Sequence, residues 1–123
     1  MLEILKPDFE FNDERGRLMQ LMHGSCAQVN FVESKPSSLR GGHYHKLNRE
    51  TFFIIDGEVE VTVKKDGKKE TYLFSSGDMF AINKNVVHYF DYKKESSLIV
   101  VYDKGVELPD GTKDIYPEET ADA

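Results

Sequence analysis

Short stretches of alternating or continuous apolar residues recur along most of the chain, and they predict β-strands. Residues 58–63 alternate strictly between polar and apolar side chains. This spacing places Val59, Val61 and Val63 on one buried face, because successive side chains of a strand point to opposite sides. Further strands are expected at residues 28–32, 51–55, 70–74, 79–82, 86–92 and 97–102. No segment shows the period of an amphipathic helix, so the sequence predicts an all-β protein.

Turn-forming residues separate these stretches, and many short strands at this spacing indicate a sandwich or a barrel. Asp66-Gly67 is the clearest turn, because it lies between two expected strands and suits a tight hairpin. A chain of 123 residues fits one compact domain, so we expect a single domain over residues 1–123. Its acidic tail, from about residue 117, is expected to be mobile.

The stretch at residues 51–55 is apolar on both of its faces, unlike a strand that has one face in water. One face is expected to pack against a second sheet. The other face is then available to a partner subunit, so we expect a homodimer.

Charge and composition narrow the possible partners. The chain carries 22 acidic and 16 basic residues, a net charge of −6, which disfavours binding to nucleic acid. The lysine-rich run at residues 64–69 is interpreted as an exposed hairpin tip. Cys26 is the only cysteine, so no disulfide can form within the chain, and this suits a reducing compartment.

Targeting signals are not evident in the sequence. Residues 1–6 include acidic and basic side chains where a signal peptide needs an apolar run. No stretch approaches the roughly 20 apolar residues that a helix needs to cross a bilayer. We therefore expect a cytoplasmic protein that does not bind a membrane.

The candidate chemistry is concentrated in residues 40–50. His43 and His45 are two positions apart, so on an extended segment their imidazoles project to the same side. Glu50 follows a turn-like segment, and a hairpin there would return its carboxylate toward the two histidines. His88 is preferred over His23 as a further partner, because it lies in an apolar strand where a neutral imidazole must be paired or bound.

Each of these residues alone would more often be an ordinary core or surface residue than a metal ligand. Together they predict a site for one divalent ion, formed by His43, His45, Glu50 and His88. Three imidazoles and one carboxylate suit Fe, Mn, Zn or Ni about equally, so the identity of the ion stays open.

The same residues resemble the two motifs of the cupins. His43-Tyr44-His45, Glu50 and Gly57 are similar in spacing to the first motif, and Gly77-Asp78 followed by His88 to the second. The second motif departs from the family pattern, because Asn83 stands where proline is usual and Asn85 where glycine is usual. The resemblance implies a small jelly-roll β-barrel with its site in the interior.

Segments outside the motifs resemble cupins that act on nucleotide sugars. Residues 11–18, 28–30 and 39–45 are similar to the opening of dTDP-4-dehydrorhamnose 3,5-epimerases and dTDP-4-keto-6-deoxyhexose ketoisomerases. Those enzymes generally work without a metal and lack a ligand of the Glu50 type, whereas this chain retains all four candidate ligands. Either the metal site persists in a sugar-acting relative, or the sugar resemblance concerns the fold alone.

The resemblance implies an isomerase or epimerase of a nucleotide sugar in polysaccharide biosynthesis. By that resemblance His43 would be the base, Tyr102 the acid and Arg40 a contact for the substrate phosphate, while a bound metal could instead polarise the ketone. Two alternatives stay open. One is an Fe(II)-dependent dioxygenase, and the other is a barrel that binds a small molecule or a metal without catalysis.

Overall fold

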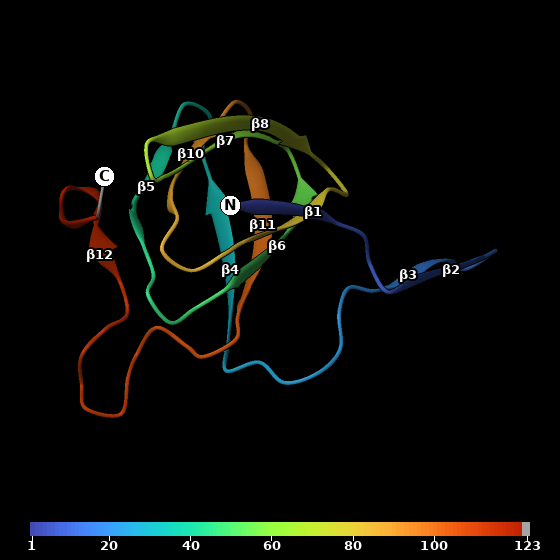
Figure 1. Ribbon diagram of the computed structural model, residues 1–123. Helices are drawn as coiled ribbons and strands as arrows, with labels where there is room; N and C mark the ends of the chain where they lie inside the picture. The colour runs from blue at the N-terminus through green and yellow to red at the C-terminus, as the bar shows by residue number, and fades with distance from the viewer. Residues whose placement is uncertain (122–123) are drawn as a thin grey trace.

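The computed structural model describes residues 1–121 and consists almost entirely of antiparallel β-strands. The first sheet has the strand order β1-β9-β6-β11-β4, and the second has the order β12-β5-β10-β7-β8. Figure 1 shows the two sheets packed against each other as a barrel. The strands are β1 Leu2–Leu5, β2 Phe9–Asp13, β3 Gly16–Gln20, β4 Gln28–Ser34, β5 Leu39–Tyr44, β6 Glu50–Asp56, β7 Glu58–Lys65, β8 Lys68–Ser75, β9 Met79–Ile82, β10 Val87–Tyr92, β11 Ser96–Tyr102 and β12 Tyr116–Pro117. The prediction of an all-β protein is confirmed.

Side chains from both sheets form one core between them. Val59, Val61 and Val63 of β7 are fully buried, as their alternation predicts. Aromatic rings continue the core, and the rings of Phe74 and Phe80 stack with their centroids 4.1 Å apart. This packing fixes β6 and β10, the strands that carry two of the candidate ligands.

The predicted strands all form, but the structure also contains several strands that the sequence pattern did not predict. The turn at Asp66 and Gly67 is confirmed, with both residues in the left-handed region at φ 52° and 76°. Strand β5 was not predicted because Gly41 and Gly42 interrupt its alternation. Strands β2 and β3 were missed because they form a hairpin outside the barrel, where no core imposes a buried face.

The hairpin of β2 and β3 projects away from the barrel (Figure 1). The side chains of Phe9, Phe11 and Leu18 are each at least half exposed on it. A two-stranded hairpin without further packing is only marginally stable in water. Within residues 1–121, no other element buries these apolar side chains.

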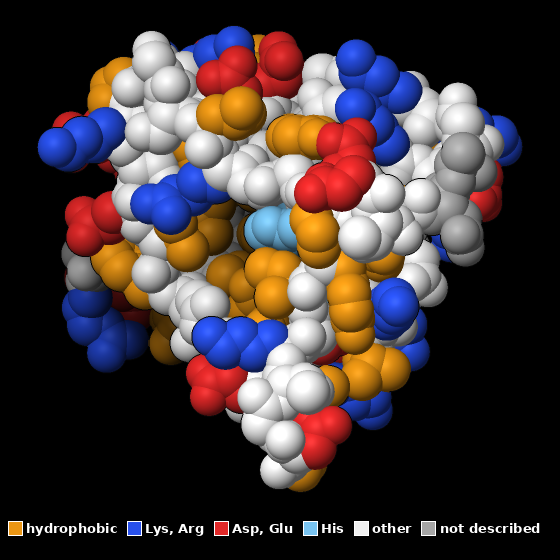
Figure 2. All heavy atoms as spheres, turned by 90° about the vertical axis from the view of Figure 1, so that its left-hand side faces the viewer, with side chains coloured by type: hydrophobic (Ala, Val, Ile, Leu, Met, Phe, Trp, Pro, Cys, Tyr) orange, Lys and Arg blue, Asp and Glu red, His pale blue; other side chains and the backbone are white. Residues whose placement is uncertain are grey.

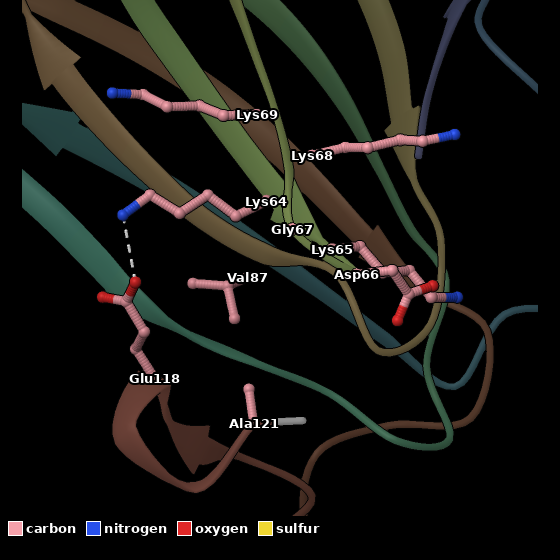
Figure 3. A pocket seen from close by; sticks show the side chains of 9 residues that line it. All are labelled: Lys64, Lys65, Asp66, Gly67, Lys68, Lys69, Val87, Glu118 and Ala121. Atoms are coloured by element: carbon pink, nitrogen blue, oxygen red, sulfur yellow. Dashed lines mark hydrogen bonds and ion pairs between the residues drawn. The ribbon is translucent and has the colours of Figure 1, made fainter. Parts of the chain in front are cut away.

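The chain after β11 returns along the second sheet and docks on β5. Tyr116 pairs with Tyr44, and the Tyr44 hydroxyl donates to the carbonyl of Thr120 at 3.1 Å. The 3₁₀ helix Glu118–Thr120 is tied to β7 by an ion pair of 3.0 Å between Lys64 and Glu118, drawn in Figure 3. The tail has these contacts as far as residue 121, and residues 122–123 lie outside the described part, so the mobility of the tail stays a prediction. Within residues 1–121 no helix is long and apolar enough to cross a membrane.

Candidate functional site

Strands β5, β6 and β10 bring the four predicted ligands together inside the barrel. His43 lies opposite His88 in the pairing of β5 and β10, and Glu50 is the first residue of β6. One ring nitrogen from each of His43, His45 and His88 lies within 4.8 Å of the other two. Glu50 Oε1 lies 3.1 Å from His45 Nε2 and 3.4 Å from His88 Nε2. The cluster therefore has the composition and the spacing of a candidate metal centre.

Two backbone features permit this close approach. Gly41 has φ 105°, and a Cβ atom there would lie 2.4 Å from the carbonyl oxygen of His88, so only glycine fits. Asn85 takes φ 62° in the turn before His88, a conformation that asparagine tolerates better than most residues. Its N–H donates to the carbonyl of His45 at 2.7 Å. Asn85 therefore provides the turn for which glycine is usual in cupins.

Hydrogen bonds to the backbone fix the tautomers of two imidazoles. His45 Nδ1 lies 2.5 Å from the carbonyl oxygen of Asp114, and His88 Nδ1 lies 3.0 Å from that of Val86. Because a carbonyl can only accept, both Nδ1 atoms must donate, and each neutral ring then directs an Nε2 lone pair toward Glu50.

Three hydrogen-bond acceptors therefore meet in a buried space. The side chains of His45, Glu50 and His88 are each about 3% exposed. Within residues 1–121, His45 Nε2 has no hydrogen-bond partner, although Glu50 Oε1 is close to it. Such a cluster is stable only when a cation lies among the lone pairs, either a proton on an imidazole or a metal ion. These residues thus fit a divalent ion.

The electrostatics differ among the four residues. Burial, and then the neighbouring imidazoles, lower the pKa of His43 to about 4, so its ring is neutral near pH 7. Burial also lowers the pKa of His88. Burial acts against the charged forms of His45 and Glu50 as well, but their mutual contact outweighs it, raising the pKa of His45 and lowering that of Glu50.

A cavity of about 110 Å³ leads to the cluster. Its walls are mostly apolar side chains from both sheets, and its polar lining includes His43, Glu50, His88, Arg40 and Tyr102. The face of the molecule in Figure 2 is hollowed, with a histidine visible among hydrophobic side chains and basic side chains at the rim. An apolar pocket with a few convergent polar groups is typical of a small-molecule site.

The other two residues singled out in the sequence, Arg40 and Tyr102, also line this cavity. Arg40 is exposed, and its guanidinium donates to the Ser34 hydroxyl at 2.8 Å and to the Glu33 carbonyl at 3.1 Å. Tyr102 is nearly buried, and burial together with the Glu50 charge raises the pKa of its hydroxyl. His23, by contrast, lies in an exposed loop next to Asp8, away from this cavity.

Sequence reasoning missed two residues that hold the site in place. Asn48 and Asp114 are buried and bond to each other. Asn48 lies in the loop between His45 and Glu50, and Asp114 accepts hydrogen bonds from that loop. Both lie in loops, where Asn and Asp are common as ordinary turn formers. Their spacing along the chain gives no signal, because 66 positions separate them.

Solved structures with the same fold come from nucleotide-sugar enzymes. A 3,4-ketoisomerase from Helicobacter canadensis has a TM-score of 0.74 at 21% identity, covering 84% of this chain and 83% of that one. A TDP-quinovose 3,4-ketoisomerase from Campylobacter jejuni has a TM-score of 0.77 at 16% identity, covering 92% of both chains. A dTDP-4-dehydrorhamnose 3,5-epimerase from Sulfolobus tokodaii has a TM-score of 0.77 at 18% identity, covering 94% of this chain and 76% of that one. The predicted cupin jelly roll is thereby confirmed.

The sequence itself matches one family model. No curated protein matches the sequence significantly. The model of the polysaccharide biosynthesis C-terminal domain matches residues 11–101, which include both cupin motifs and all four candidate ligands. The chain therefore belongs to the polysaccharide biosynthesis C-terminal domain family.

Proposed function

We propose that this protein is an isomerase or epimerase of a nucleotide-linked keto sugar in polysaccharide biosynthesis. The observation that carries the proposal is a cavity that contains a neutral imidazole, a tyrosine and an arginine, namely His43, Tyr102 and Arg40. The names of the structural neighbours, which are ketoisomerases and epimerases of related sugars, support the same substrate class.

The chemistry of the proposed reaction fits these three side chains. A proton beside the sugar ketone must be removed and returned to another carbon or another face. The neutral ring of His43 can accept that proton, since its low pKa keeps it unprotonated near pH 7. Tyr102, whose raised pKa keeps its proton in place, can donate to the enolate oxygen. Arg40 at the cavity rim can contact a phosphate of the nucleotide.

We further propose that His45, Glu50 and His88 hold one divalent ion, next to the ring of His43. When bound, such an ion would polarise a ketone oxygen and balance the charge of an enolate. One imidazole nitrogen cannot bind an ion and accept a proton at the same time. The rings of His45 and His88 are anchored to backbone carbonyls, whereas within residues 1–121 the His43 ring makes no such bond. We therefore propose that His45, Glu50 and His88 are the ligands of the ion and that His43 transfers the proton.

Solvent exchange tests the proposed reaction directly. We expect the protein to incorporate deuterium from heavy water next to the ketone of a nucleotide-linked 4-keto-6-deoxy sugar, without consuming oxygen. Proton NMR on a panel of such sugars would follow the exchange, and an oxygen electrode would follow oxygen. Oxygen uptake that requires Fe(II) and substrate, without exchange, would favour the dioxygenase instead. Binding with neither reaction would favour a non-catalytic cupin.

We also propose that two copies of the chain associate through the outer face of the first sheet. Phe31 of β4, Ile99 of β11 and Phe53 of β6 lie side by side on this face. The side chains of Phe31 and Ile55 remain 60% and 42% exposed. A contiguous apolar face suits an interface between identical subunits, and the exposed β2–β3 hairpin is available to extend it.

Light scattering after size exclusion would test this interface. We expect a dimer at micromolar concentration and a monomer for Phe31→Arg, because a buried charge without a partner disfavours association. Leu73→Arg is the matched control, since Leu73 is 62% exposed on β8 of the opposite sheet. A dimer that persists in Phe31→Arg, or a monomeric unmodified protein, would contradict the proposed interface.

A further inference from the structure

The loop that joins two proposed ion ligands is held by a distant part of the chain. His45 precedes this loop, residues 46–49, and Glu50 follows it. The connection between β11 and β12, residues 103–115, lies against the loop and forms buried hydrogen bonds with it. We infer that two residues of this contact, Asp114 and Asn48, are positioning residues that set the geometry of the ion site. The inference depends on the proposed ion site.

Asp114 contacts both the ligand and the loop. Its main-chain carbonyl accepts the Nδ1–H of His45, which sets the orientation of that ring and leaves Nε2 facing Glu50. Its carboxylate accepts the N–H of Lys46 at 2.8 Å and that of Leu47 at 3.0 Å. Since the side chain is fully buried, water cannot replace these partners. One residue thus fixes the ring and the start of the loop together.

Asn48 completes this contact from the loop side. Its amide group donates to the Gly105 carbonyl and to Asp114 Oδ2, both at 2.8 Å. Its side-chain oxygen accepts the N–H of Lys104 at 3.1 Å and that of Gly105 at 2.9 Å. Both amide hydrogens and both acceptor positions are therefore used, in a side chain that is 1% exposed. No other neutral side chain of this size offers two donors and two acceptors.

This arrangement has the form of an outer coordination sphere. Residues that hydrogen-bond to a metal-binding histidine fix its tautomer and its direction, and their loss costs about 10–100-fold in metal affinity. Here the outer partner holds His45 and, through the loop, limits where Glu50 can lie. A purely structural contact would stabilise the fold without altering the affinity or the geometry of the ion site. The two roles therefore make different predictions.

The test uses Co(II) as the probe and Asp114→Asn as the variant. In the variant an amide N–H replaces one acceptor and faces a loop N–H, so one buried bond is lost. The main-chain carbonyl that accepts from His45 Nδ1 remains in this variant, so only the side-chain contact with the loop is weakened. We therefore expect the dissociation constant for Co(II), measured by competition with a chromophoric chelator, to rise about 10-fold, the lower end of the range for outer partners. We also expect the visible absorption of bound Co(II) to change, because it reports ligand geometry.

Two further variants complete the comparison. Glu118→Gln removes the ion pair with Lys64 in the same C-terminal region (Figure 3), and we expect it to leave Co(II) affinity and absorption unchanged. If Asp114→Asn does not fold, Asn48→Ser, which removes the amide donors, carries the same expectation.

The outcomes separate this inference from the proposed ion site. A folded Asp114→Asn protein with unchanged affinity and absorption overturns the positioning role, while the ion site stands. Failure of the unmodified protein to bind Co(II), Zn(II), Fe(II), Mn(II) or Ni(II) overturns the ion site itself. If Glu118→Gln weakened Co(II) binding to the same extent, any destabilisation of the C-terminal region would have this effect. That result would also contradict a specific role for Asp114.

Discussion

Replacement of His43 with glutamine is expected to lower the rate of sugar isomerisation by about 10²- to 10⁴-fold, the usual contribution of a general base. Glutamine retains the polarity and much of the volume of the imidazole but cannot accept a proton at neutral pH. The measurement is the rate of deuterium incorporation into the nucleotide sugar. His23→Gln is the matched control and should leave the rate unchanged, because His23 is exposed in a loop away from the cavity.

The metal content of the His43→Gln protein distinguishes its two proposed roles. If His43 is the base, the variant should retain its ion, because His45, Glu50 and His88 supply three ligands, a number that catalytic zinc sites use. Loss of the ion together with activity would instead make His43 an essential ligand. An undiminished exchange rate would refute the assignment of His43 to proton transfer.

Replacement of His45 with alanine is expected to remove the ion almost completely. His45 Nε2 lies 3.1 Å from Glu50 Oε1 and is buried without a hydrogen-bond partner within residues 1–121, so the ion loses a fully enclosed ligand. Since even outer partners of a ligand contribute about 10–100-fold in affinity, loss of the ligand itself should exceed about 100-fold. Elemental analysis of protein purified without chelator should show about one ion per chain before the change.

A control for this second experiment is His23→Ala, which should retain the ion. Circular dichroism must show that the His45→Ala protein keeps its β-structure, because that residue is buried. Full metal content in folded His45→Ala would contradict the assignment of the ligands. Absence of metal from the unmodified protein, even after addition of Fe, Mn, Ni and Zn, would contradict the ion site and favour a protonated His45 paired with Glu50.

The sequence was sufficient to name the four clustered residues because local patterns encode them. The spacing of His43 and His45 in an extended segment predicts that they share one side, and His88 lies in a strand apolar enough to be recognised as buried. Strand β7 could also be predicted from the sequence, because its polar and apolar residues alternate strictly. In each case the residues that carry the signal are neighbours along the chain, so no knowledge of the tertiary fold was needed.

The supports of the site could not be predicted in this way. Asn48 and Asp114 meet only after the whole barrel has formed, and nothing near either residue indicates the other. The glycine at position 41 shows the same limit, since its need for a close approach to His88 arises from a strand pairing that local sequence does not reveal. Likewise, the docking of β12 on β5 depends on two segments about seventy residues apart.

The contact between Asp114 and the loop after His45 also has a consequence for synthesis on the ribosome. Translation makes the loop long before it makes the segment that fixes it, because the two are separated by more than 60 residues. A nascent chain therefore exposes His43 and His45 while their later partners are still absent. Any ion captured at that time would be held loosely and could exchange. The proposed ion would thus be selected late, by the finished barrel, at the ion concentrations that surround the released protein.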